Sequence, residues 1–572
     1  MVEEVTPLQE EGKKSIVPDG AQKKWFWMMA GIIACGALIR IAAAVGNGRF
    51  WFDEIITWEI AARPWSEMGK YLAMENHPPL HYLIVAAWMR LFGAGEIVVK
   101  MSSVLAGALG IWVTGLFGKR LFGARAGLWA AGITALSTYH IFFSAEARMY
   151  PWLYLFGTLS LWMWWEMTRP HTNPNSPDYN NMIQSAAAAV PLSGESSHTV
   201  VGIGVGVKRG ETKYRWLWFL STVAALYTHL GAVFLLAIEG VWYLWVWWRE
   251  KKRGTGAPAL PLRSGLILLG ASLLAWLPWI MVFLKEKAQT LNRNAWYFWV
   301  ELQEPLPIEA VRRFFFLESF TEFMDLFAWI FVIGALLLAW GMLRKKEGGK
   351  LAWEWEATRA RGYCLLVLLL PLFMGFLAHV SVIKIYTVAS AGAYLLAGAG
   401  LAKIILPRPI PPWIFPAAVT GLFLAHMSGV IVGVKPSWRD VGQYLSAHEG
   451  EADAVVILSH AYQVALEHYY TGQTPVLPFY PLPDDTGGDT LLRAVRRNWY
   501  TILTDKNIDE LKTLVAGKQK IFLVVVGRFY KVERIGLEWF MARGWKLKSV
   551  AKWEDFMVNP EVYLFERSMI SG

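Results

Sequence analysis

Cysteine and charge are both scarce in this sequence. Its 572 residues include two cysteines, Cys35 and Cys364, and both lie inside apolar runs, so neither a disulfide framework nor a cysteine-based metal site is expected. Charged residues make up 17% and hydrophobic residues 55%, whereas soluble domains have about 25% charged and 45–50% apolar residues. The apolar residues gather in runs of roughly 17–25, the length that crosses a bilayer core of about 30 Å. The sequence therefore predicts a polytopic α-helical membrane protein.

The sequence also lacks the features of a nucleic-acid-binding protein, although its net charge is +10. The lysines and arginines lie mostly in short clusters beside apolar runs, where such residues orient membrane spans. There is no zinc-finger spacing and no basic domain with interleaved aromatic residues. Nucleic acid is therefore not an expected partner, and membrane lipids are.

Eleven apolar runs are candidate transmembrane helices. They occupy residues 25–46, 98–117, 126–142, 149–167, 214–230, 231–248, 264–284, 323–343, 362–380, 386–405 and 412–434. With the N-terminus inside, the basic clusters at 119–125, 169–215, 249–253, 344–346 and 403–408 all fall on the cytoplasmic side, as the positive-inside rule requires. We therefore expect a multi-pass plasma-membrane protein with about eleven spans.

The polar segments between the spans complete the expected organisation. Residues 1–24 are predicted to be a cytoplasmic tail before an uncleaved start-anchor, and residues 25–434 a transmembrane domain. The first external loop covers 47–97 and contains a short apolar segment, 77–93, which we expect to be an interfacial helix because it is short for a span and opens with prolines. Residues 168–213 form a Ser/Asn/Gly-rich cytoplasmic insert, predicted to be flexible.

The composition changes after Val434. Residues 435–572 contain the strand-like runs "ADAVVILS", "IFLVVVG" and "EVYLFE" and the helix-like run "ERIGLEWFMARG". This alternation predicts a small α/β domain on the external side.

An acidic pair, Asp53 and Glu54, lies at the start of the first external loop in "WFDEIITWEIAARPW" (51–65). Carboxylates favour helix N-termini, so the pair could simply cap an interfacial helix. The same loop carries "ENHPPLHY", in which two prolines fix the backbone beside His77. That motif could be a rigid start of the interfacial helix or a site that holds His77 in a defined place.

Further ionisable residues are expected on the same face. "YHIFFSAEARMYPW" (139–152) places Glu146, Arg148 and Tyr150 between two spans, where charged residues are costly and are functional candidates by default. A self-satisfied Glu–Arg pair is the alternative. His229 in "YTHL" could be a packed residue, and Lys384 could be a snorkelling lysine or a partner for an anionic lipid phosphate. Acids on the first loop and cations on later turns suit activation of a hydroxyl and neutralisation of a phosphate leaving group.

These motifs, in the order "WFDE", "HPPLHY", "KMSSVLAG", "SAEARMY" and "YTHL", resemble the dolichyl-phosphate-mannose–protein mannosyltransferase superfamily. This superfamily consists of GT-C fold glycosyltransferases of family 39 type, with a branch that includes the bacterial lipid A aminoarabinose transferases. The resemblance covers about residues 25–435 and is concentrated in 50–155, and "KPSWRDVGQYL" (435–445) is similar to the start of the extracytoplasmic domain in many bacterial members. Lys384 stands where many relatives have arginine, and "AEARMY" differs from the lipid A branch, which leaves the sugar and acceptor open.

The resemblance implies a polyprenyl-phosphate-linked sugar as donor and an acceptor hydroxyl on protein, lipid or glycan. Asp53 would be the general base and Glu54 its catalytic neighbour, and Arg148 and Lys384 would bind the donor phosphate. The residues implied in sugar or acceptor binding are His77, Glu146, Tyr150, His229 and Tyr386. Transfer would be an in-line displacement with inversion, and no cofactor is indicated, although a divalent metal ion is compatible with the pattern.

Two other classes of membrane protein stay open. A surface-polysaccharide polymerase or ligase could have a similar charge layout. A lipid or solute transporter would also place charges at membrane depth, but should show interrupted spans in two repeated halves, and no such repeat is found.

Overall fold

The computed structural model describes most of the chain. The described residues are 19–75, 77–169, 207–253, 260–291, 307–317, 321–340, 345–347, 350–352, 355–377, 383–404, 407, 409–427, 437–458, 462–479, 487–495, 508–526, 532–553 and 559–567. The predicted tail up to residue 18 and the predicted insert from 170 to 206 lie outside them.

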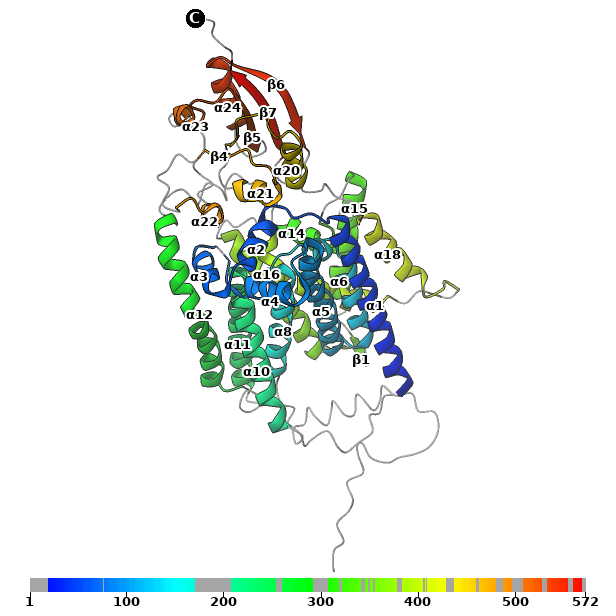
Figure 1. Cartoon of the computed structure of the whole chain (residues 1–572). Helices are drawn as coiled ribbons and strands as arrows, with labels where there is room; N and C mark the ends of the chain where they lie inside the picture. Colours follow the sequence, from blue (N-terminus) through cyan, green and yellow to red (C-terminus); the bar gives the residue numbers. More distant parts are fainter. Residues whose placement is uncertain are drawn as a thin grey trace, which may run out of the picture.

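A helical bundle forms the larger part of the molecule (Figure 1). Its helices are α1 (Asp19–Gly46), α5 (Glu96–Phe122), α6 (Ala124–Leu136), α7 (Thr138–Ser144), α8 (Tyr150–Thr168), α10 (Val207–Leu226), α11 (Val233–Arg253), α12 (Leu262–Leu291), α14 (Pro307–Phe315), α15 (Glu322–Trp340), α16 (Trp355–Leu377), α17 (Thr387–Leu401) and α18 (Ile414–Ala425). Two 3₁₀ turns, η1 (Leu230–Ala232) and η2 (Ile383–Tyr386), and a small hairpin of β1 (Lys345–Glu347) and β2 (Lys350–Ala352) join parts of it.

The bundle contains six helices in the described residues that are long and apolar enough to cross a membrane. They cover 20–46, 96–122, 230–252, 262–285, 322–339 and 358–377. A mostly helical membrane protein is therefore confirmed, whereas the count of eleven spans stays a prediction. The run predicted at 126–142 is divided, because Ser137 ends α6 and its hydroxyl accepts a hydrogen bond from the His140 N–H to start α7.

Helix α17 lies at the centre of the bundle, and every one of its residues is buried. A Cβ at Gly398 would lie 2.8 Å from the Ala126 carbonyl oxygen, and one at Gly400 would lie 2.4 Å from the Ala335 carbonyl oxygen. The glycines therefore allow α6 and α15 to pack directly on the α17 backbone. Such close approach is how membrane helices gain packing energy where lipid offers no hydrophobic drive.

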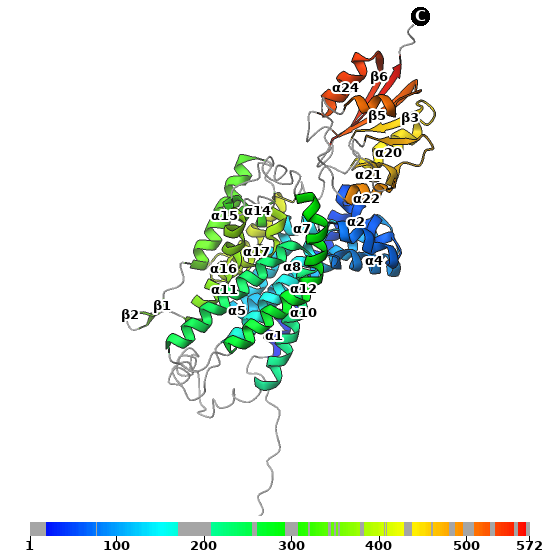
Figure 2. The ribbon, with the colours of Figure 1, turned by 90° about the vertical axis from the view of Figure 1, so that its left-hand side faces the viewer.

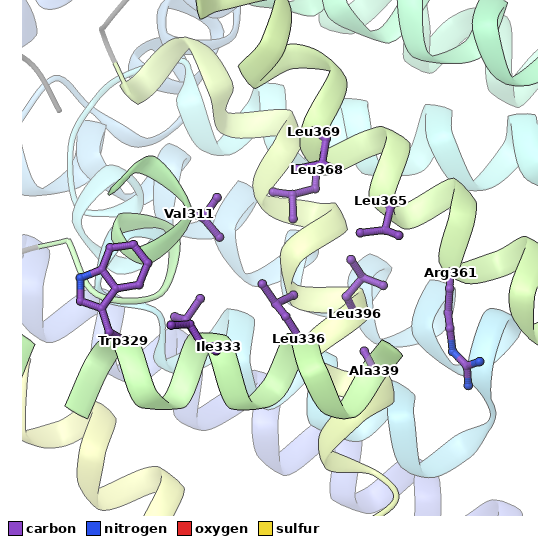
Figure 3. A pocket seen from close by; sticks show the side chains of 11 residues that line it. Val311, Trp329, Ile333, Leu336, Ala339, Arg361, Leu365, Leu368, Leu369 and Leu396 are labelled. Atoms are coloured by element: carbon purple, nitrogen blue, oxygen red, sulfur yellow. The ribbon is translucent and has the colours of Figure 1, made fainter. Parts of the chain in front are cut away.

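A mostly apolar cavity of about 230 Å³ lies between α14, α15, α16 and α17 (Figure 3). Trp329 and Arg361 stand at its two ends in that view, with the rows of α15 and α16 side chains between them. Of the eleven lining residues, Arg361 is the only charged one.

Three of the basic residues next to the spans, Lys119, Arg120 and Arg125, lie at one end of the bundle. The Lys119 ammonium lies 3.9 Å from the centre of the Trp25 ring, at the start of α1, and Arg120 pairs with Glu166 at the end of α8. Arg125 donates a hydrogen bond to the Ile404 carbonyl beyond α17. The opposite end of the bundle therefore carries the segments that follow α1 and precede α5.

Those segments form three short helices, α2 (Phe52–Ala62), α3 (Trp65–Met74) and α4 (Leu80–Phe92). Helix α4 has 13 residues and is apolar, which is too short for a span. Figure 2 shows α2 and α4 beside the bundle and beneath the C-terminal sheet.

The C-terminal part contains a five-stranded sheet in the order β4-β3-β5-β7-β6. Strands β4 and β5 run parallel to β3, and β7 runs antiparallel to β5 and β6. The strands are β3 (Ala454–Ile457), β4 (Val476–Pro478), β5 (Lys520–Val526), β6 (Trp545–Lys552) and β7 (Pro560–Arg567), and the helices are α20 (Trp438–Ala447), α21 (Gln463–Tyr469), α22 (Thr490–Val495), η4 (Ile508–Glu510), α23 (Leu511–Leu514) and α24 (Val532–Ala542). The three runs that read as strands in the sequence are β3, β5 and β7.

The C-terminal part packs directly on α2. The Phe52 ring lies 4.7 Å from that of Tyr462, and the His468 imidazole bonds the Glu59 carboxylate at 2.9 Å. Glu96, at the start of α5, accepts hydrogen bonds from Arg439 and from the Tyr469 hydroxyl. Helix α2, which carries the acidic pair, therefore contacts both the C-terminal part and the bundle.

Candidate active site

The acidic pair lies in the first turn of α2, and its two members have different partners. The Asp53 carboxylate pairs with Arg148 at 3.1 Å, whereas the Glu54 carboxylate lies 3.4 Å from the Lys100 ammonium. Asp53 is 8% exposed and Glu54 is 1% exposed. Only Asp53 therefore presents part of its side chain to solvent or a ligand.

Glu54 holds the backbone around it. Its carboxylate accepts hydrogen bonds from the Trp51 N–H at 3.1 Å, which caps α2, and from the Ala147 N–H at 2.6 Å. The capping alternative raised by the sequence is thus realised by this member of the pair. Burial raises the pKa of the Glu54 carboxyl, while Lys100 and the two backbone donors oppose that change. Its contacts make Glu54 a brace between α2 and the turn at 145–149.

Lys100 was not identified from the sequence, because it lies inside an apolar run. Its buried ammonium donates to the carbonyls of Asn47 at 2.6 Å and Arg49 at 2.9 Å, in addition to its pairing with Glu54. Ser103, one turn further along α5, donates to the Arg148 carbonyl at 3.1 Å. Residues three apart on a helix share a face, so one face of α5 holds both the start of the first loop and the turn at 145–149.

The turn at 145–149 connects α7 to α8 and carries Glu146 and Arg148. The Arg148 guanidinium is fully buried, bonds the Asp53 carboxylate and backbone carbonyl, and lies 3.5 Å from the Tyr150 hydroxyl. The pair that the sequence suggested between Glu146 and Arg148 is replaced by a pair between Asp53 and Arg148. The donor-phosphate role of Arg148 stays a prediction.

A buried arginine fixes the helix that leads into this turn. Arg40 on α1 donates to the carbonyls of Gly36, Thr134 and Ala135 and to the side chains of His140 and Ser144. All five guanidinium donors are therefore used, which satisfies the group inside the bundle. Because Ser144 is the last residue of α7, this network sets where the turn begins.

His77 and His229 meet beside the turn, as the sequence predicted for residues of one face. Their rings stack with centres 5.1 Å apart, and the His229 ring lies 5.6 Å from that of Tyr150. The Leu80 N–H donates to the Tyr227 carbonyl at 2.9 Å, which ties the "HPPL" segment to the end of α10. The two imidazoles therefore belong to the same group of rings as Tyr150.

Lys384 and Tyr386 lie together on η2, before α17. The half-buried Lys384 ammonium is 5.8 Å from the centre of the Tyr150 ring. Within the described part of the chain it has no hydrogen-bond or ion-pair partner. Tyr386 stacks on Phe234 with ring centres 6.0 Å apart, and its hydroxyl occupies the space beside Gly375 on α16. Lys384 thus joins the cluster through Tyr150, while Tyr386 packs against α11 and α16.

These residues form one cluster at one end of the bundle, which combines acids, cations and a layer of aromatic and imidazole rings. Its three acids are Asp53, Glu54 and Glu146, and its three cations are Lys100, Arg148 and Lys384. Ionisable groups of opposite sign are each held by specific partners, except Glu146 and Lys384, which have none in the described residues. Such a site can bind an anionic group beside Lys384 and present a carboxylate to a hydroxyl.

Comparison with known proteins agrees with this architecture. Residues 76–178 match the family described as dolichyl-phosphate-mannose-protein mannosyltransferase. The structure is similar to that of ArnT from Cupriavidus metallidurans bound to undecaprenyl phosphate, with a TM-score of 0.53 and 14% identity over 93% of this chain and 97% of that one. The apo structure of the same protein gives a TM-score of 0.50 and 14% identity over 95% and 98%.

No curated protein sequence matches the chain. The family match includes His77 and the turn at 145–149 but ends before His229 and Lys384. The resemblance to the GT-C glycosyltransferases is nevertheless confirmed: residues 76–178 match the mannosyltransferase family, and the chain as a whole shares its fold with ArnT.

Proposed function

We propose that the protein is a membrane glycosyltransferase that moves a sugar from a polyprenyl-phosphate-linked donor to an acceptor hydroxyl. The observation that carries the proposal is the pairing of Asp53 with Arg148 beside Lys384, which has no ion pair in the described part of the chain, together with the fold that the chain shares with ArnT. The structure of ArnT with undecaprenyl phosphate supports a lipid phosphate as the leaving group.

In the proposed step, the acceptor oxygen bonds to the anomeric carbon as the bond from that carbon to the phosphate oxygen breaks. The acceptor proton passes to Asp53, and the electron pair leaves with the polyprenyl phosphate. The configuration at the anomeric carbon is inverted because the two bonds lie in line. A positioned general base contributes about 10²–10⁴-fold to such a reaction.

The contacts of Asp53 suit this role. A base must be ionised to accept a proton, and the neighbouring guanidinium of Arg148 favours the ionised carboxylate. The Thr57 hydroxyl and Arg148 both bond the Asp53 backbone carbonyl, which fixes the first turn of α2. Lys384 would stabilise the negative charge that develops on the departing phosphate. His77, Tyr150 and His229 provide rings and polar atoms for the sugar.

We further propose that the site end of the bundle and the C-terminal sheet face outside the cell. The basic residues at the other end would then lie in the cytoplasm with the N-terminus, as the positive-inside rule requires. The lipid tail of the donor explains why the site lies where the bundle meets the short helices α2 to α4. The proposed step uses only the chain's own side chains.

The direct test is to incubate the purified protein in detergent with a panel of polyprenyl-phosphate sugars and candidate acceptors and to measure released polyprenyl phosphate. We expect release from at least one donor, and its loss in Asp53→Asn. Absence of release from every donor, or equal release by Asp53→Asn, would contradict the proposal.

A further inference from the structure

Glu146 differs from the two acids of α2. Asp53 is paired with Arg148, and Glu54 is paired with Lys100 and bonded by two backbone N–H groups. The Glu146 carboxyl, in contrast, has no hydrogen bond and no ion pair within the described residues, although the side chain is only 8% exposed. A buried polar group without a partner is costly, so its retention needs a reason.

The charges around Glu146 come from four elements. The pKa of Glu146 is affected by the charges of Glu54 on α2, Lys100 on α5, Arg148 on its own turn and Lys384 on η2. Burial and the negative charge of Glu54 outweigh the three cations and raise the pKa of Glu146 to about 8. Lys100 and Arg148 are already paired with other carboxylates, whereas Lys384 has no ion pair among the described residues. The neutral acid is therefore the main form at pH 7.

A neutral carboxyl has a property that the other two acids lack. It carries an O–H donor, whereas an ionised carboxylate can only accept hydrogen bonds. A phosphate group bound near Lys384 would meet one cation, and it gains negative charge when the sugar leaves. An ionised acid at this position would repel that charge, and a protonated acid would stabilise it.

We propose that Glu146 acts in its protonated form as a hydrogen-bond donor to the phosphate of the lipid-linked donor. This inference rests on the proposed function. The proton stays on Glu146 throughout: the electron pair of the broken carbon–oxygen bond moves to the phosphate, and the acceptor proton moves to Asp53. Lys384 supplies the positive charge and Glu146 a directed donor that adds no charge of its own.

The experiment measures binding of a polyprenyl phosphate to the purified protein in detergent at pH 7 and at pH 9. Below its pKa Glu146 is neutral and donates, and above it the carboxylate repels the phosphate. We expect wild-type affinity to fall about tenfold between the two values. The second ionisation of a phosphate monoester, near pH 6, and that of lysine ammonium groups, ordinarily near 10, lie outside this interval.

Glu146→Gln keeps a donor and removes the titration. We expect its affinity to stay within about threefold of wild type at pH 7 and to show no fall at pH 9. Glu67→Gln makes the same change on the exposed surface of α3 and should behave as wild type. In turnover assays, Glu146→Gln should lose the decline at alkaline pH, whereas Glu146→Ala should be impaired at both values.

The outcomes separate the inference from the function on which it rests. Wild-type binding that does not change with pH, or an equal fall in Glu146→Gln, overturns the donor role of Glu146 alone. Loss of turnover in Glu146→Gln, with wild-type turnover rising at high pH, also overturns it, because Glu146 would then be a base. If wild-type protein binds no polyprenyl phosphate at either pH, the proposed function fails and the inference fails with it.

Discussion

The Lys100–Glu54 pair should be a principal support of the site, and Lys100→Met tests this. Methionine has a similar length and is apolar, so it fills the same space without the ammonium. The change leaves the 1%-exposed Glu54 carboxylate without its cation and removes the ammonium donor from the carbonyls of Asn47 and Arg49. Removing one member of a buried pair costs about 3–5 kcal/mol, because the remaining charge stays buried.

A matched control exists in the same loop region. Lys70 on α3 also pairs with a carboxylate, that of Asp489 at 3.1 Å, but its side chain is 51% exposed. Water and salt screen such a pair, so Lys70→Met should change stability little. Both substitutions exchange lysine for methionine, and they differ in the burial of the ion pair.

Thermal unfolding in detergent provides the assay, because the 32 tryptophans give a strong intrinsic fluorescence signal. We expect Lys100→Met to unfold at a clearly lower temperature than both wild type and Lys70→Met. In Glu54→Gln/Lys100→Met both charges are gone, so the double variant should lose less stability than the sum of the two single variants. Equal unfolding temperatures for Lys100→Met and Lys70→Met, or strict additivity in the double variant, would refute a supporting pair.

Three further predictions concern the cluster and the surface above it. Asp53→Asn should lower turnover by about 10²–10⁴-fold while membrane insertion stays at the wild-type level, and turnover near that of wild type would exclude Asp53 as the base. Lys384→Ala should weaken donor binding by about tenfold or more, with partial recovery in Lys384→Arg, and unchanged donor affinity would exclude a phosphate contact. Tyr469→Phe removes the hydroxyl that bonds Glu96 and the Phe50 N–H, and should destabilise the protein by about 1–2 kcal/mol in thermal unfolding. The control Tyr470→Phe removes a hydroxyl that bonds an exposed carboxylate and should not destabilise the protein. Equal effects of the two substitutions would argue against the Tyr469 contact as a support of α2.

Sequence motifs pointed to most members of the candidate site because these residues lie at the ends of apolar runs. Asp53 follows the first span, Glu146 and Arg148 lie between two runs, and Lys384 precedes a third. Charged residues in such places are few and conspicuous, so their common face could be inferred from topology. His77 was found because the two prolines after it mark a fixed backbone.

The pairing within the cluster could not be predicted in the same way. Lys100 and Glu54 are 46 positions apart, and Arg148 and Asp53 are 95 apart, so no helical period relates them. Local pattern left open the alternative that Glu146 and Arg148, two residues apart, satisfy each other. The contacts of α5 decide otherwise, because Ser103 and Lys100 fix the turn and the first loop so that Asp53 faces the guanidinium.

The number of membrane spans is harder to predict from the sequence than their presence. Hydropathy joins neighbouring apolar segments, whereas the structure divides them where a polar side chain finds a specific partner. Ser137 separates α6 from α7 in this way, since its hydroxyl also donates to the Phe314 carbonyl at 2.6 Å. That contact connects elements 177 positions apart, and no window of sequence contains both.

The three acids of the site differ in what surrounds them rather than in residue type, and this orders their expected sensitivity to substitution. Glu54 braces two backbone segments, so its amide variant should lose stability first and activity as a consequence. Asp53 pairs with the buried Arg148, and the amide oxygen of Asp53→Asn can still accept from that guanidinium, so this variant should lose chemistry with less change in folding. Glu146 has no partner in the described residues, so Glu146→Gln should change neither stability nor turnover strongly at pH 7. Its effect on donor binding should appear only as the pH rises past about 8. A glutamine scan of these three positions at two pH values therefore distinguishes a brace, a base and a neutral donor within a single site.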